Sequence, residues 1–135
     1  MRTLWLLSCL CLLVSSCFPI AGVTHPSDVE LRDAYYGPPP PENYKEIVED
    51  RIKRDLIDPY SAQFEFSGNP IKAWTYNEAW SGPQFFYGWG VCGTVNAKNR
   101  MGGYSGRKLF MAFFQSGALF EIYHESRAST RGCRY

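Results

Sequence analysis

The sequence predicts an α+β fold, in which one N-terminal helix packs on a mostly antiparallel sheet of four to five strands. Apolar residues recur at helical spacing between residues 44 and 57. From residue 63 onward, short β-type runs alternate with turns that contain Gly and Asn. Abundant aromatic residues are typical of a small sheet packed with large rings.

The helix is expected to begin just after Pro41 and to run to about Ile57. Pro59 ends it, because a proline disfavours the α conformation at the residue before it. The charged residues on the other side predict a solvated face. The stripe that would face the sheet consists of Tyr44, Ile47, Val48, Ile52 and Leu56.

The strands are expected at five places along the second half of the chain. Residues 63–67 and 71–76 are two short runs, separated by a Gly-Asn-Pro turn. Residues 84–97 form the clearest strand, with strict alternation of side chains. Residues 108–115 and 118–124 are predicted to form a hairpin around a Ser-Gly turn.

Residues 1–16 have the layout of a signal peptide, with Arg2 followed by a short apolar run. Val14-Ser15-Ser16-Cys17 resembles the lipobox of bacterial lipoproteins. We expect cleavage before Cys17, whose thiol would carry a diacylglycerol with palmitate-type chains. The alternative is an ordinary signal peptide cut near Ala21.

Residues 17–43 are expected to tether a single domain, residues 44–135, to the membrane lipid. The tether contains Pro38-Pro39-Pro40-Pro41, which favours extended polyproline II. The alternative is an ordered arm packed on the domain, with Tyr35 and Tyr36 as its anchors.

The five cysteines divide according to this processing. Cys9 and Cys11 leave with the signal and Cys17 is acylated. Cys92 and Cys133 remain as an even pair in an oxidising compartment and are predicted to form a disulfide. Two separate buried thiols are the alternative. Since zinc-type Cys and His spacings are absent from the sequence, no metal site is predicted.

Charge and titratable residues favour neither nucleic-acid binding nor catalysis. The 14 Lys and Arg residues balance the 13 Asp and Glu residues, whereas nucleic acids require a basic face. Outside the signal peptide the histidines are His25 and His124. His124 with Glu121 or Glu125 is a lone acid/base pair without a nucleophile. We expect no catalytic residues and no cofactor, unless His124 lies in a cleft beside a carboxylate.

Two segments, residues 56–64 and 91–106, resemble a family of small proteobacterial exported lipoproteins. The longer segment contains the pattern Cys-Gly-x-Val-Asn-Ala-Lys-Asn, followed by a Gly-Gly-Tyr turn. The shorter one is a helix-ending Asp-Pro corner, in which Ile57 and Tyr60 depart from the commonest residues. The resemblance covers roughly residues 44–114. It implies an exported, disulfide-competent domain and no particular reaction.

The polar connection between residues 96 and 106 is the candidate binding loop. Its basic side chains and tyrosine suit an anionic group such as a phosphate, a peptidoglycan carboxylate or an acidic protein patch. The alternative is a loop whose Asn side chains satisfy its own backbone. The candidate contact residues are Asn96, Lys98, Asn99, Arg100 and Tyr104.

These observations predict a non-enzymatic envelope lipoprotein that binds a periplasmic protein or a cell-wall component. An inhibitor or immunity protein against a wall-degrading enzyme, or an accessory subunit of an envelope secretion machine, are the alternatives. Phe18 follows Cys17, where an aspartate would retain a lipoprotein in the inner membrane of enteric bacteria. We therefore expect the outer membrane, with the domain facing the periplasm.

Overall fold

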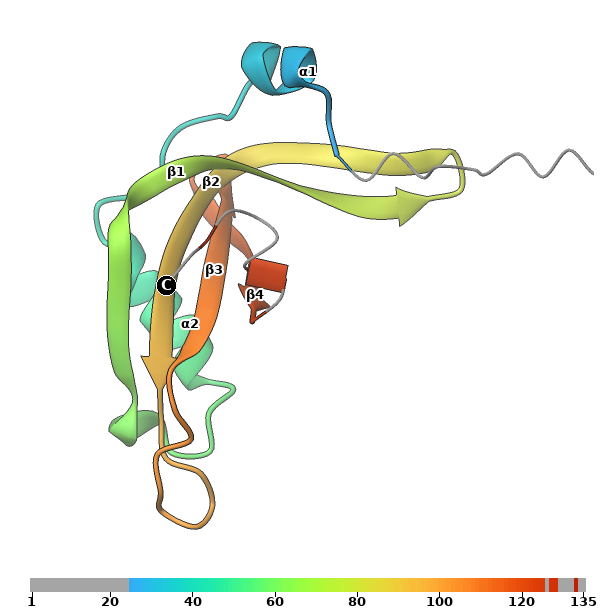
Figure 1. Cartoon of the computed structure of the whole chain (residues 1–135). Coiled ribbons are helices and arrows are strands. Elements are labelled where there is room, and N and C mark those ends of the chain that lie inside the picture. The colour runs from blue at the N-terminus through green and yellow to red at the C-terminus, as the bar shows by residue number, and fades with distance from the viewer. Residues whose placement is uncertain (1–24, 126, 129–132, 134–135) are drawn as a thin grey trace, which may run out of the picture.

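The computed structural model describes residues 25–125, 127–128 and 133, and it has the α+β class that the sequence predicts (Figure 1). Four antiparallel strands form one sheet in the order β1-β2-β3-β4. The elements are α1 (Asp28–Asp33), α2 (Tyr44–Lys53), the 3-10 turn η1 (Pro59–Ser61), β1 (Gln63–Ala79), β2 (Gly82–Asn96), β3 (Lys108–Gln115) and β4 (Ala118–His124). The signal peptide and Cys17 lie outside the described residues.

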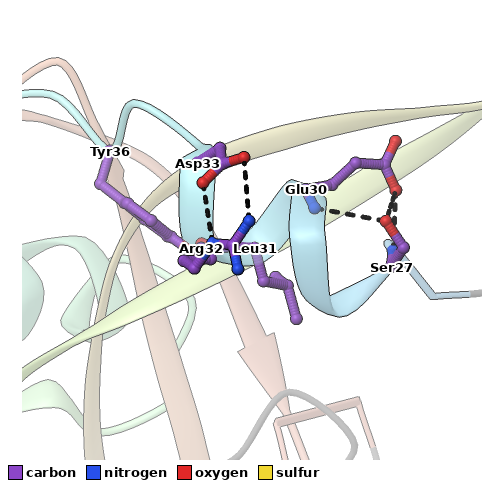
Figure 2. A network of polar contacts seen from close by, with 6 residues as sticks. All are labelled: Ser27, Glu30, Leu31, Arg32, Asp33 and Tyr36. Atoms are coloured by element: carbon purple, nitrogen blue, oxygen red, sulfur yellow. Dashed lines mark hydrogen bonds and ion pairs between the residues drawn. The ribbon is translucent and has the colours of Figure 1, made fainter.

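Helix α1 is a difference from the single predicted helix, and its start is set by a capping box (Figure 2). The Ser27 hydroxyl accepts a hydrogen bond from the Glu30 backbone N–H, and the Glu30 carboxylate accepts from the Ser27 backbone N–H. The hydrogen bonds that the Glu30 carboxylate accepts from the Ser27 backbone N–H and from the Ser27 hydroxyl lower the pKa of Glu30. A short, locally capped helix of this kind has no apolar stripe long enough to reveal it in the sequence.

Helix α2 ends at Lys53, four residues before the predicted Ile57. The chain tightens there, because the N–H groups of Asp55 and Leu56 donate to carbonyls three residues back instead of four. Val48 and Ile52 are buried, and Leu56 still packs against the same apolar cluster from beyond the helix. Four of the five residues of the predicted stripe, all except Ile47, therefore pack against the sheet although the helix is shorter.

Strand β1 corrects the prediction of two separate runs at residues 63–67 and 71–76. The Gly-Asn-Pro segment is a bulge instead of a turn, since pairing with β2 shifts between Ser67 and Ile71 and then continues. Gly68 takes the left-handed conformation there, with a φ of 64°. The predicted hairpin at residues 108–115 and 118–124 is confirmed as β3 and β4.

The core has two layers, one on each face of the sheet. On one face, Val48 and Ile52 of α2 pack with Val91, Phe110 and Phe114. On the other face, Cys92, Met111 and Tyr123 pack with Ala128 and Cys133 of the C-terminal segment. The predicted disulfide is confirmed between Cys92 and Cys133, whose Cα atoms are 5.5 Å apart.

Half of the β1–β2 hairpin extends beyond the rest of the sheet. Strand β3 pairs with β2 only from Trp89 to Val95, so residues 73–88 form a two-stranded ribbon that we call the distal arm. Figure 1 shows this arm bending away from the part of the sheet that carries α2. No helix among the described residues is long and apolar enough to cross a membrane.

The described part of the expected tether, residues 25–43, lies against the domain. The Trp89 indole N–H donates to the Gly37 carbonyl at 3.1 Å, and the ring centroids of Tyr36 and Tyr87 are 5.8 Å apart. Tyr36 is 8% exposed, whereas Tyr35 is 85% exposed. These contacts correspond to the alternative of an ordered arm packed on the domain. Of the two tyrosines considered as its anchors, Tyr36 is buried and Tyr35 is not.

Candidate functional site

The two segments that carry the sequence motifs, residues 56–64 and 91–106, meet at one corner of the molecule. The Lys98 backbone N–H donates to the Ser61 hydroxyl at 2.9 Å, and the Gln63 side-chain amide donates to the Tyr104 hydroxyl at 3.2 Å. We call residues 55–63 and 96–108 the motif corner. It lies at the end of the β1–β2 hairpin opposite to the distal arm, where the β2–β3 loop projects beyond the sheet (Figure 1).

The asparagines of the loop organise its backbone. The Asn99 side-chain oxygen accepts hydrogen bonds from the N–H groups of Met101 and Gly103, at 2.9 and 3.2 Å. The Asn96 side-chain oxygen accepts from the Gly106 N–H at 3.1 Å. Asn96 and Asn99 therefore form hydrogen bonds with the backbone of their own loop, as the alternative to a binding role predicts, and these bonds organise the loop.

The basic side chains of the loop divide into paired and outward-facing groups. Arg107 forms an exposed ion pair with Glu65 on β1, which offsets its charge beside the loop. Lys98 and Tyr104 lie opposite each other in an isolated bridge, and the ammonium nitrogen is 5.7 Å from the ring centroid. Arg100 is exposed. The structure therefore brings Lys98 and Tyr104 together and leaves Arg100 at the loop tip.

A small cleft of about 250 Å³ opens between the end of α2 and the base of the loop. Lys98 and Lys108 are its cationic lining, and Asp55, its acidic lining, is bound by Arg51. Arg100 and Tyr104 do not line it. This arrangement suits a small anionic group attached to an apolar body. The lining residues are Asp55, Leu56, Ile57, Val95, Ala97, Lys98, Asn99, Ser105 and Lys108.

Three apolar side chains of the motif corner are exposed, and the sequence did not single them out as contacts. Ile57 is 64% exposed, Tyr60 fully exposed and Met101 94% exposed. One signal was available for Ile57, because it falls outside the apolar stripe of the helix. Tyr60 also lines a second hollow of about 350 Å³, together with Lys53, Pro59 and Ala62.

The acid/base pair considered between His124 and Glu121 is not assembled. His124 and Glu121 lie three residues apart on β4, so their side chains leave opposite faces of the strand. The Glu121 carboxylate instead accepts a hydrogen bond from the Tyr123 hydroxyl. His124 does not line the cleft, and desolvation lowers its pKa despite the opposing fields of Asp55 and Glu125. Within residues 25–125, 127–128 and 133, no group of three His, Cys, Asp or Glu residues could hold a metal ion.

Comparison with protein-family models, with curated proteins and with solved structures gave no significant match.

Proposed function

We propose that this chain is a non-enzymatic, lipid-anchored binding protein of the bacterial envelope. Its motif corner would receive an anionic group of a periplasmic protein or of the cell wall. The observation that carries the proposal is the cleft at that corner, whose lining includes Lys98 and Lys108 together with the apolar residues Leu56, Val95 and Ala97.

The two kinds of side chain at the corner would divide the work of binding. Exposed ion pairs contribute only about 0–1 kcal/mol each, so Lys98 and Lys108 would select and orient an anionic partner. Most of the affinity would come from burying Ile57, Tyr60 and Met101, which are exposed in the free chain. Because Asn96 and Asn99 already fix the loop, binding would cost little conformational entropy.

The lipid anchor is supported by the sequence of residues 1–17 and is tested by intact mass. Protein purified from its native membrane should have the mass of residues 17–135 plus a diacylglyceryl group, with or without a third acyl chain. A mass that matches cleavage near Ala21 without lipid would contradict the anchor and leave a freely diffusing protein.

The binding proposal is tested by capture from a detergent-solubilised envelope extract and by co-sedimentation with isolated peptidoglycan sacculi. We expect Lys98→Ala/Lys108→Ala to lose the partners or sacculi that the wild type retains. Arg32→Ala/Lys72→Ala is the matched control, because it removes two exposed basic residues far from the corner. If both double variants recovered the same partners or sacculi in equal amounts, the motif corner would not be the binding site.

An inhibitor of a wall-degrading enzyme is the second candidate, and the shape of the loop favours it. The loop projects from the end of the sheet (Figure 1). Met101 in this loop is 94% exposed, and its backbone N–H donates to the Asn99 side chain. A projecting rigid loop can enter an active-site cleft. The test is inhibition of lysozyme by the purified protein, with Met101→Asp expected to abolish it. Absence of inhibition by the wild type would discard this candidate for that enzyme.

A further inference from the structure

The distal arm ends in an exposed aromatic tip that the binding proposal does not use. Trp80 is fully exposed in the turn between β1 and β2. Behind it, the half-buried rings of Trp74, Tyr76 and Phe85 form a cluster, with centroids 5.6 Å apart for Trp74–Phe85 and 6.1 Å apart for Tyr76–Phe85. We call Trp74, Tyr76, Trp80 and Phe85 the aromatic tip.

The tip combines large amphipathic rings with few charged residues on the two strands that carry it. Between Lys72 and Lys98, the sequence contains a single charged residue, Glu78. Trp and Tyr are enriched where a protein meets the headgroup layer of a bilayer, because one end of the ring is apolar and the other can form hydrogen bonds. Burying such a surface there removes apolar area from water with little cost of charge desolvation.

The position of the N-terminal segment indicates that the aromatic tip lies close to a membrane. His25, the first described residue, packs edge-on against Trp74 of the tip, with ring centroids 5.4 Å apart. Cys17 precedes His25 by eight residues. An extended chain spans at most about 3.5 Å per residue, so a lipid on Cys17 would lie within roughly 30 Å of Trp74.

Because the chain between Cys17 and the tip is short, even a weak contact between the tip and the bilayer would be occupied. A tip with one fully exposed tryptophan would bind a bilayer poorly on its own. The short chain to Cys17 would make that binding intramolecular, at an effective concentration in the millimolar range.

We propose that the aromatic tip inserts into the headgroup layer of the bilayer that holds the Cys17 lipid. This inference rests on the proposed lipid anchor. The arm then lies at the membrane surface, and the motif corner, at the other end of the β1–β2 hairpin, is held away from it toward the periplasm (Figure 1).

The experiment uses the acylated protein purified from its native membrane and reconstituted into phosphatidylcholine vesicles with brominated acyl chains. Beyond the signal peptide the tryptophans are Trp74, Trp80 and Trp89. We expect a loss of tryptophan emission relative to unbrominated vesicles. Trp80→Phe should abolish most of that loss, because it removes the fluorophore nearest the lipid. Trp89→Phe is the control and should retain the loss, since Trp89 is half-buried beneath Gly37.

Equal emission in brominated and unbrominated vesicles would overturn the inference. So would a dimer in detergent in which Trp80 is shielded, because the occupant would then be a second copy of the chain. The quenching should be the same at low and high salt and with or without phosphatidylglycerol; quenching that disappears at high salt would overturn a contact made by nearly uncharged rings.

Intact mass and vesicle flotation separate the two proposals. A protein that carries lipid and floats, but is not quenched, overturns the tip contact alone. A protein that carries no lipid overturns the anchor and this inference with it.

Discussion

The two ends of the β1–β2 hairpin are stabilised by different interactions. The motif corner is shaped by hydrogen bonds between polar side chains and backbone, such as those from Met101 and Gly103 to Asn99, and it leaves apolar side chains exposed. The distal arm is shaped by aromatic packing, with Tyr36 against Tyr87 and Trp74 against Phe85. The comparison shows that the two ends of one hairpin are held by different forces, polar hydrogen bonds in the loop of the motif corner and ring packing in the distal arm.

Between these ends lies the body of the sheet, on which both depend. Residues Leu109–Phe114 of β3 are at most 1% exposed, because α2 covers one face and the C-terminal segment covers the other. The disulfide holds that segment against β2. Changes in the body should therefore affect both ends, whereas changes at one end should remain local.

The largest effect is expected from Cys92→Ser/Cys133→Ser. The two cysteines are 41 residues apart, and the chain-entropy model gives a loop of that size about 4 kcal/mol of stability. Urea unfolding should show this loss, with the tryptophan emission of the arm changing in the same transition as the body. A loss of stability below about 1 kcal/mol would contradict this prediction. An arm that unfolds in a separate transition would show that its stability does not depend on the body of the sheet.

Gly88→Ala should have the next largest effect, because Gly88 lies where the arm leaves the sheet. A Cβ at this position would overlap the Phe114 carbonyl oxygen and would be 2.9 Å from the Phe113 ring. We expect a loss of about 1–3 kcal/mol in the free energy of unfolding. Gly103→Ala in the loop is the matched control, since its Cβ would have no atom closer than 4.0 Å. Equal effects of the two variants would contradict the close contact.

Asn99→Ala should loosen the loop and leave the arm unchanged. It removes two hydrogen bonds, each of which contributes about 1 kcal/mol. Amide exchange at Met101 and Gly103 should accelerate by about fivefold or more, without a change in global stability. Asn77→Ala, an exposed asparagine of the arm, is the control. Unchanged exchange in Asn99→Ala would show that something else holds the loop.

The smallest effect concerns pH. Desolvation lowers the pKa of His124 from 6.5, so the unfolded chain binds the proton more readily than the folded chain. This group's contribution to stability is therefore present above pH 6.5 and is lost as the pH falls through the lowered value. His124→Gln should flatten the pH dependence of urea stability in that window. Because the ring is exposed, the change should be well below 1 kcal/mol. A steeper dependence in the variant would contradict the direction of the shift.

Much of the motif corner could be predicted from the sequence, but its cleft could not. Asn96, Lys98 and Asn99 were identified from a local pattern of polar residues, and the hydrogen bonds of Asn99 are local, running to Met101 and Gly103. The contact of the Lys98 N–H with Ser61 joins distant segments. The pairing of Arg107 with Glu65 and the exposure of Tyr60 depend on how β1 and the end of α2 lie beside the loop. Sequence spacing carries no information on such distant neighbours.

The sequence by itself determined the α+β class, the apolar stripe of α2, the β3–β4 hairpin and the pairing of Cys92 with Cys133. Each follows from short-range periodicity or from residue type. Only the tertiary structure decided that Gly68-Asn69-Pro70 is a bulge within one strand, because a long partner strand continues its hydrogen bonds past it. Only the tertiary structure likewise placed residues 25–37 on the arm, since that packing joins rings such as Tyr36 and Tyr87 that are far apart in the chain.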